Sequence, residues 1–426
     1  MSTPLPSDET ATQASKNVLR QLVKSTGDPS HVDHLDSSDF PEGGVTAWGT
    51  VLGAFLVQFC GAGYTTSYGV FQDFYTQIYL TNSTPSEIAW IGSVNAFLTF
   101  SVGLVSGSTP DHTPSYHVMK IGCFLQCLFL FMLSLAKPNG YYQASLIFLS
   151  QGIGSGIAIG LTNIPSIAVV AHHFERRRAF AMGLVVAGVS MGSILHPIML
   201  NNLINGRLGF ANGVRVSAGM IGGLLLIAYL LMHTRLPPQP KAVSYTRVLQ
   251  ISLRDPAYVC ACLGIAAFEV GFFFVAFYLQ LDSRWHGVSK EFSFYSLTIS
   301  NTSSFIGRLT AGVISAYVGI PNTIISCSFT SSAVIFSMIG LRSLASVALI
   351  GISYGYFSGV TIALIGPLTS YLTPEVSDLG ARIGISFTMT GSPICGAVLT
   401  SHYIWWRPAV LAGVSGSCDV AFSYSG

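Results

Sequence analysis

Hydrophobic positions along the chain gather in long runs that short polar stretches separate. A helix needs about 20 mostly apolar residues to cross a bilayer. Runs near that length predict membrane-spanning helices at 47–71, 87–107, 118–136, 144–168, 179–203, 213–233, 257–280, 293–314, 321–341, 344–366, 381–400 and 408–423. The last run is short, contains Asp419 and stops at the chain end, so we interpret it as a truncated helix. The pattern predicts an all-α membrane protein with 12 transmembrane helices.

One polar interruption is longer than the others and divides the chain into two groups of six helices. It holds several prolines and arginines between Arg235 and Asp255. We therefore expect an N-terminal six-helix bundle over 45–235, a cytoplasmic linker over 236–255 and a C-terminal six-helix bundle over 256–426. Residues 1–44 are polar and lack a signal-peptide core, which predicts a disordered cytoplasmic tail. Such a split is typical of transporters whose two bundles rock about a central site.

Composition supports a bilayer environment and disfavours other classes of function. Half of the residues are hydrophobic and 9% are charged, against about 25% charged in soluble domains. A net charge of +2 without a basic stripe argues against a nucleic-acid partner. No Cys/His cluster completes a metal site, and no catalytic triad or nucleotide loop is present in the sequence. We expect a protein that is not an enzyme and that binds no metal or cofactor.

Loop cations indicate how the chain is oriented. The densest clusters, at 176–178 and in the linker, fall on the same side as the N-terminal tail. Since cytoplasmic loops carry the excess of Lys and Arg, both termini are predicted to be cytoplasmic, most simply at the plasma membrane. The sequon Asn82-Ser83-Thr84 then lies in an outer loop, which makes Asn82 a candidate glycosylation site.

Two ionisable residues lie deep inside predicted helices. Placing Arg308 or Glu269 at the centre of a membrane helix costs about 2.5–3.5 kcal/mol on insertion scales, so each needs a reason to be there. Arg308 can grip a carboxylate and is a candidate substrate anchor, or it forms a structural ion pair with Glu269. Asn301 and Ser304 precede it at helical spacing, and we expect all three on one face.

Glu269 stands among aromatic residues, in Phe268-Glu269-Val270-Gly271-Phe272-Phe273-Phe274. An apolar setting favours the neutral form of a carboxyl group. Glu269 is therefore a candidate proton-binding site for coupled transport, with protons as a possible second substrate beside the organic solute. A nearby Arg308 would instead favour the charged form of Glu269. The sequence alone does not decide which form predominates.

Several segments resemble the monocarboxylate porter family of the major facilitator superfamily, and in particular its fungal members. Pro41 to Trp48 (PEGGVTAW) is similar to the family's signature at the start of helix 1. Phe174 to Gly183 (FERRRAFAMG), with Pro197 further on, resembles its second signature. The eighth predicted helix, with Asn301, Ser304 and Arg308, looks like the family's arginine-bearing helix.

The resemblance implies alternating access, with a solute bound between the bundles and an inner gate formed by Asp111 and Arg176, Arg177 and Arg178. The chain also departs from the family pattern. Helix 1 has no lysine, and Ser304 stands where lactate-type members carry an aspartate. The resemblance to fungal members therefore points to a transporter of an organic anion or secondary metabolite, with efflux as one direction. The alternative is a sensor-like relative that binds a solute without moving it.

Overall fold

The computed structural model describes residues 43–83, 85–107, 115–137, 143–233, 245–285, 289–338, 343–373 and 378–388. The chain divides into two units, Met1–Pro41 and Glu42–Gly426, and only the second contains described residues. The predicted tail and the predicted helix at 408–423 lie outside the described residues. Within them the secondary structure is helical, and no strand occurs there.

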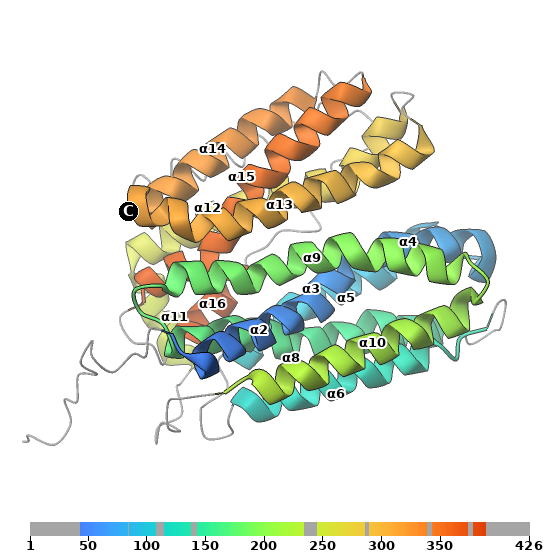
Figure 1. The fold of residues 1–426 in the computed structure, drawn as a ribbon, viewed down its shortest axis with the longest axis horizontal. Helices are drawn as coiled ribbons and strands as arrows, with labels where there is room; N and C mark the ends of the chain where they lie inside the picture. Colours follow the sequence, from blue (N-terminus) through green and yellow to red (C-terminus); the bar gives the residue numbers. More distant parts are fainter. Residues whose placement is uncertain are drawn as a thin grey trace, which may run out of the picture. The chain divides into compact units, whose positions relative to one another are not determined.

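The N-terminal half begins with a span in several pieces (Figure 1). The pieces are α2 (Val45–Cys60), α3 (Ala62–Thr65), α4 (Tyr68–Phe74) and a π-helical turn, η2 (Tyr75–Tyr79). The helices that follow are α5 (Pro85–Gly107), α6 (Ser115–Leu133), α7 (Gln143–Ile147), the π-helical η3 (Phe148–Gly154), α8 (Ser155–Ala168), the 3-10 turn η4 (Val169–His172), α9 (Arg178–Ile204) and α10 (Gly209–Leu231).

The C-terminal half contains α12 (Pro256–Trp285), α13 (Lys290–Val318), α14 (Ile320–Ser337), α15 (Leu344–Tyr371) and the described part of the next helix, α16 (Leu379–Thr388). The stretch predicted as a linker contains a short helix, α11 (Tyr245–Arg254), which meets the start of α12 at 92°. Val248 and Ser252 of α11 are buried, while Ile251 and Leu253 are exposed. The linker thus packs one face of a helix against the C-terminal half.

Local sequence explains several helix boundaries. Ser289 caps α13 by accepting a hydrogen bond from the backbone N–H of Phe292. Gly319 has a φ of 88° and separates α13 from α14, whose first turn contains Pro321. A side chain is strained at positive φ, so glycine suits this junction. Ser343 and Ser346 form a reciprocal capping box at the start of α15.

Six helical segments among the described residues are long and apolar enough to cross a membrane, and seven if the bent α11–α12 pair counts as one span. The apolar parts of α5 and α6, Trp90–Ser106 and His117–Leu133, are shorter. Eleven of the predicted runs overlap described helices, from α2 to α16. The prediction of an all-helical membrane fold is confirmed.

The two halves meet mainly along α9 and α13, which lie side by side in opposite directions (Figure 1). The fit is tight, because a Cβ atom at Gly312 of α13 would overlap the backbone of Phe180 on α9. A Cβ atom at Gly183 of α9 would lie 3.1 Å from the carbonyl oxygen of Arg308. A second contact joins α5 to α16, where a Cβ at Gly384 would lie 3.0 Å from Cα of Leu104. Small residues thus allow the halves to approach closely.

Candidate functional site

Arg308 lies where α13 crosses α9, and it is only 4% exposed. Its Nη1 donates a 2.7 Å hydrogen bond to the backbone carbonyl of Val186 on α9. Its buried Nε has no hydrogen-bond partner among the described residues. A guanidinium carries five N–H donors in a planar fork, so one bond to a carbonyl leaves most of its capacity for another acceptor.

Ser304 and Asn301 precede Arg308 on the same helix. Ser304 is buried, and its Oγ accepts a 3.2 Å hydrogen bond from Oγ of Ser190 on α9. Asn301 is half-buried. Ser304 and Arg308, one turn apart, therefore both face α9, and each makes a polar contact with the opposite half of the molecule.

Glu269 is on α12 and is 5% exposed. It interacts electrostatically with Arg308, so the two charged residues singled out from the sequence belong to one site. Phe268, its neighbour, packs on Phe272 with ring centroids 6.5 Å apart. The site combines one cation and one acid, and aromatic residues neighbour the acid on α12.

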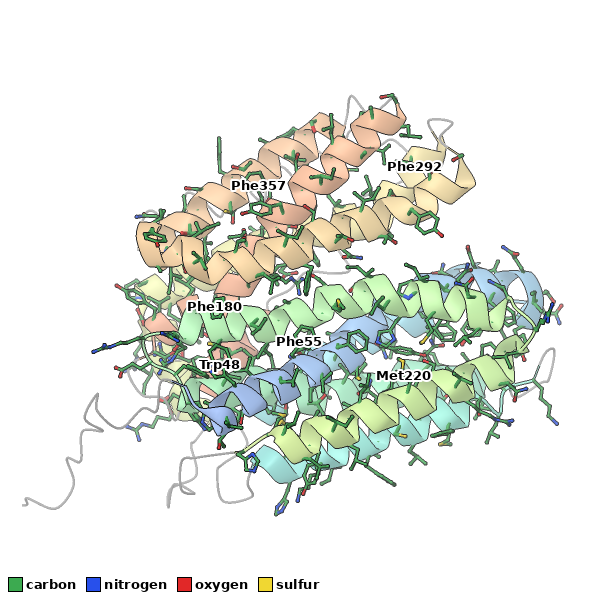
Figure 2. The ribbon with its side chains drawn as sticks, in the orientation of Figure 1. Trp48, Phe55, Phe180, Met220, Phe292 and Phe357 are labelled. Carbon is green, nitrogen blue, oxygen red and sulfur yellow. The ribbon has the colours of Figure 1, made fainter. Side chains whose placement is uncertain are left out.

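The start of α9 forms a further contact between the halves, through Arg178. The Nη1 of Arg178 donates a 2.6 Å hydrogen bond to Oγ of Ser370 near the end of α15, and its Nε donates to the carbonyl of Phe174. Trp48 packs edge-on against Phe174 and Phe180, at 5.1 Å and 6.3 Å between centroids. Figure 2 shows Trp48 and Phe180 near the same end of α2 and α9.

The other predicted gate and modification residues are placed differently. Arg176 and Arg177 are exposed in the turn before α9. Asn82 is exposed in the turn between η2 and α5. Asp111 lies outside the described residues, as does Thr84 of the sequon.

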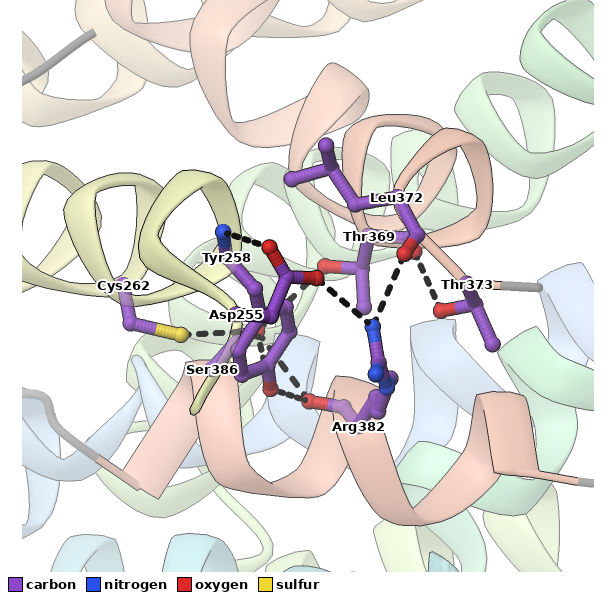
Figure 3. Close-up of polar contacts among 8 residues, drawn as sticks. All are labelled: Asp255, Tyr258, Cys262, Thr369, Leu372, Thr373, Arg382 and Ser386. Atoms are coloured by element: carbon purple, nitrogen blue, oxygen red, sulfur yellow. Dashed lines mark hydrogen bonds and ion pairs between the residues drawn. The ribbon is translucent and has the colours of Figure 1, made fainter. Parts of the chain in front are cut away.

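A polar cluster that the sequence did not single out as a site lies in the C-terminal half (Figure 3). Arg382 of α16 donates through Nη1 to the carbonyl of Leu372 at 2.8 Å and approaches Oδ2 of Asp255 at 3.6 Å. Asp255 in turn accepts from the backbone N–H of Tyr258 in the first turn of α12. Arg382 thus links the end of α15, which favours a cation, to the start of α12, which favours an anion.

The first span is interrupted at Gly61, and other helices bond to the interrupted backbone. Nε2 of His196 on α9 lies 3.1 Å from the carbonyl oxygen of Phe59, and Nε2 of Gln126 on α6 donates to the carbonyl of Cys60. Carbonyls in the last turn of a helix have no partner within it. His196 was missed from the sequence. The signal that could have found it is a histidine directly before Pro197 in an apolar span.

Another buried contact joins α2 to α8. Nε2 of Gln58 donates to Oδ1 of Asn163 at 2.8 Å and to Oγ of Ser166 at 2.9 Å. The sequence did not predict this contact, because single amide and hydroxyl side chains are common in membrane helices as interhelical hydrogen-bond partners. The contact fixes two helices of the N-terminal half near the level of the first-span break.

Two helical halves that meet around a buried cation and acid, in a chain with several apolar spans, define a polytopic membrane transporter. Comparison with protein families identifies the superfamily. The model of the Major Facilitator Superfamily matches residues 50–400, and the chain belongs to that superfamily. It is accordingly a multi-pass membrane protein. The predicted all-helical major facilitator fold is confirmed, and the count of twelve spans in two six-helix bundles stays a prediction.

Curated relatives include several fungal efflux proteins. The chain is 35% identical over 374 residues to the aspyridones efflux protein apdF of Emericella nidulans, covering 86% of this chain and 74% of the relative. It is 33% identical over 383 residues to the fujikurins efflux protein of Gibberella fujikuroi, covering 88% and 81%. It is 31% identical over 362 residues to the agnestins efflux protein AgnL12 of Paecilomyces divaricatus, covering 83% and 81%.

Solved structures show the same fold. The transporter FucP in the outward conformation superposes with a TM-score of 0.68 at 15% identity, covering 88% of this chain and 98% of FucP. The proton:xylose symporter XylE superposes with a TM-score of 0.68 at 14% identity, covering 89% and 95%. At this identity the likeness concerns the arrangement of helices. The chain is a secondary transporter by family, and the solved structures show that it shares their fold.

Proposed function

We propose that this transporter exports a small organic anion, of the monocarboxylate or acidic secondary-metabolite type, across the plasma membrane. Export is supported by the relatives, several of which are named as efflux proteins. The proposal places both termini on the cytoplasmic side, in line with the cations of the turn before α9 and of α11.

The burial of Arg308 at the contact between the halves is the observation that supports an anionic substrate. Arg308 is a buried cation, it belongs to the C-terminal half, and its Nη1 hydrogen bond reaches the N-terminal half. An anion that enters between α9 and α13 would meet N–H groups from a guanidinium already held in place. Charge-assisted hydrogen bonds of this kind are among the strongest in proteins. The substrate would therefore bind to both halves through one residue.

Glu269 gives the proposal a proton-coupling step. Its carboxylate and an incoming anion would compete for the same guanidinium. When the anion binds to Arg308, the positive charge of Arg308 no longer compensates an ionised Glu269. Because Glu269 lies in apolar surroundings, it then binds a proton. The proton and the anion then move in the same direction, and the compound leaves the cell as an acid.

Counterflow in reconstituted vesicles tests transport directly. Aspyridones, fujikurins and agnestins, the compounds in the relatives' names, form the first panel, together with simple monocarboxylates. A transporter exchanges labelled external compound for unlabelled internal compound, whereas a sensor binds it without exchange. Binding to wild-type protein with no counterflow would reject the transport proposal in favour of the sensor-like alternative. Arg215→Lys, on the exposed surface of α10, is the control variant.

A further inference from the structure

His196 is a buried imidazole in the N-terminal half that the proposed anion site does not use. It is 0% exposed, and its ring packs on Phe59 and Tyr64 with centroids 4.5 Å and 5.3 Å away. Its Nε2 faces the carbonyl oxygen of Phe59 at 3.1 Å. Because a carbonyl oxygen only accepts hydrogen bonds, Nε2 must carry the proton.

The tautomer determines the state of the other ring nitrogen. In a neutral imidazole protonated on Nε2, the second nitrogen, Nδ1, carries a bare lone pair. Nδ1 of His196 is buried and has no hydrogen-bond partner among the described residues. A buried acceptor without a donor is costly, and in a native protein it calls for a specific explanation. A proton that binds there reversibly is one such explanation.

His196 also lies where two helices are locally weakened. Its hydrogen bond satisfies a carbonyl at the end of α2, just before the interruption at Gly61. The next residue on α9 is Pro197, which has no N–H and cannot bond the carbonyl of Ser193 one turn earlier. Breaks of this type are the places where membrane helices bend. A change of charge at His196 would therefore act on two flexible points at once.

The titratable and charged groups on the neighbouring elements leave His196 without an acidic partner among the described residues. On the facing α2–α3 segment, Tyr64 contacts the ring, and the thiol of Cys60 bonds to the carbonyl of Ile221. Several groups on other elements packed against α9 are directed elsewhere. Tyr68 of α4 bonds to the carbonyl of Ile88, Arg215 of α10 to Ser134 and Asn212, and Arg308 of α13 to the carbonyl of Val186. Tyr356 of α15 bonds to Thr310, and Asp73 of α4 and Tyr371 of α15 are exposed.

We propose that His196 is a reversible proton-binding site whose protonation is linked to a movement of α9, the helix that contacts α2 and α3 at His196 and α13 nearer its own start. The inference rests on the proposed transport function but is a separate step from anion binding at Arg308. In the arrangement described here, an imidazolium at His196 would be a buried charge without a counter-ion, which is costly. Protonation therefore favours an arrangement in which the contacts of α2, α3 and α9 open toward water. Acidification shifts the molecule away from the present arrangement.

The first test is direct and needs no substrate. The full chain is placed in lipid nanodiscs with ¹⁵N-labelled histidines and titrated from about pH 8 to about pH 4, because burial disfavours the charged imidazole and extends the range below that of an exposed histidine. The His196 signal, assigned as the one lost in His196→Gln, moves from the singly to the doubly protonated pattern. A His196 signal that stays singly protonated throughout overturns the proposal.

The second test measures the movement. Spin labels are attached through non-canonical amino acids at the exposed positions Asn202 on α9 and Tyr295 on α13, in a Glu269→Gln chain so that this acid does not contribute. The ratio of the two arrangements changes with pH by up to about tenfold per pH unit, the limit for one linked proton. His196→Gln, which keeps a donor for the carbonyl of Phe59, makes the ratio independent of pH.

Matched variants keep the second test decisive. His196→Phe retains the ring contacts and replaces His196→Gln if that chain does not fold. His173→Gln is the control, since His173 is also buried with Nε2 on a backbone carbonyl, that of His233. A pH response that survives in the His196 variants, or that disappears in His173→Gln, contradicts the proposal. A compound panel that shows no transport would reject the proposed substrates and leave these readings unaffected.

Discussion

Within the part of the chain that the structure describes, Arg308 makes one hydrogen bond, to a backbone carbonyl, and its buried Nε has no partner. A buried donor without an acceptor costs free energy. At the residue scale the unused donor, in a cation that contacts both halves of the molecule, suggests a ligand. Glu269 shares the site through its electrostatic interaction with Arg308.

Arg308→Lys keeps the charge and removes the planar fork. Loss of a charge-assisted hydrogen bond of about 1.5–3 kcal/mol should weaken binding of an anionic substrate roughly 10- to 100-fold. Counterflow at a fixed, low concentration of labelled anion measures this loss, and fluorescence of a tagged chain checks membrane expression. Uptake equal to that of wild type would remove Arg308 from the binding site.

Glu269→Gln keeps the shape of the side chain and removes the proton-binding group. Anion counterflow should persist, but the proton movement that accompanies net anion flux should disappear. A pH-sensitive dye trapped in the vesicles reports this movement. Unchanged proton movement in the variant would exclude Glu269 as the coupling acid.

At the scale of elements, glycines set the approach of α9 to α13. A Cβ atom at Gly312 would overlap Phe180, whereas a Cβ atom at Gly223 of α10 would meet nothing within 4 Å. Gly312→Ala should destabilise the present contact by about 1–3 kcal/mol. Gly223→Ala, the control, should stabilise its helix by up to about 1 kcal/mol.

Distances between spin labels at the start of α9 and the end of α13 measure the effect of Gly312→Ala. The distribution should broaden or shift to longer values in that variant and stay unchanged in the control. Identical distributions in both variants would show that the glycine contact does not limit the approach of the halves.

The Arg382 cluster permits a second prediction at this scale. Arg382→Ala leaves the carbonyl of Leu372 without its donor and should lower stability by about 1–3 kcal/mol. Asp255→Asn should cost about 1 kcal/mol or less, because Asp255 is 31% exposed and the pair is partly screened by solvent. Thermal unfolding in nanodiscs compares them, and equal losses would contradict this ranking.

Hydrophobic runs predicted most of the helices because each span must satisfy its own backbone hydrogen bonds in lipid. The break at Gly61 escaped prediction, since it is stabilised by His196 and Gln126 from distant helices. The helix α11 was not predicted, because the prolines and charges around it indicated a linker. For the site, Arg308 and Glu269 stood out as charges in apolar runs, whereas their shared location depends on how α12 and α13 pack.

At the scale of the whole molecule, three hydrogen bonds join the halves through the first part of α9, between Arg178 and Ser190. The proposed anion site is in this same stretch, so a bound solute would act on the surfaces that also join the halves. A ligand can shift a conformational equilibrium only through different interactions in its two states. Competition for Arg308 among substrate, Glu269 and the carbonyl of Val186 supplies such a difference.

Metabolite profiling tests the central claim most directly. Cells that express wild-type protein, Arg308→Lys or no protein are compared for the compounds in the medium and inside the cell. The account predicts at least one acidic metabolite that appears in the medium with the wild-type chain and stays inside the cell with Arg308→Lys. Identical profiles in all three strains, with the protein present in the membrane, would contradict export of an organic anion.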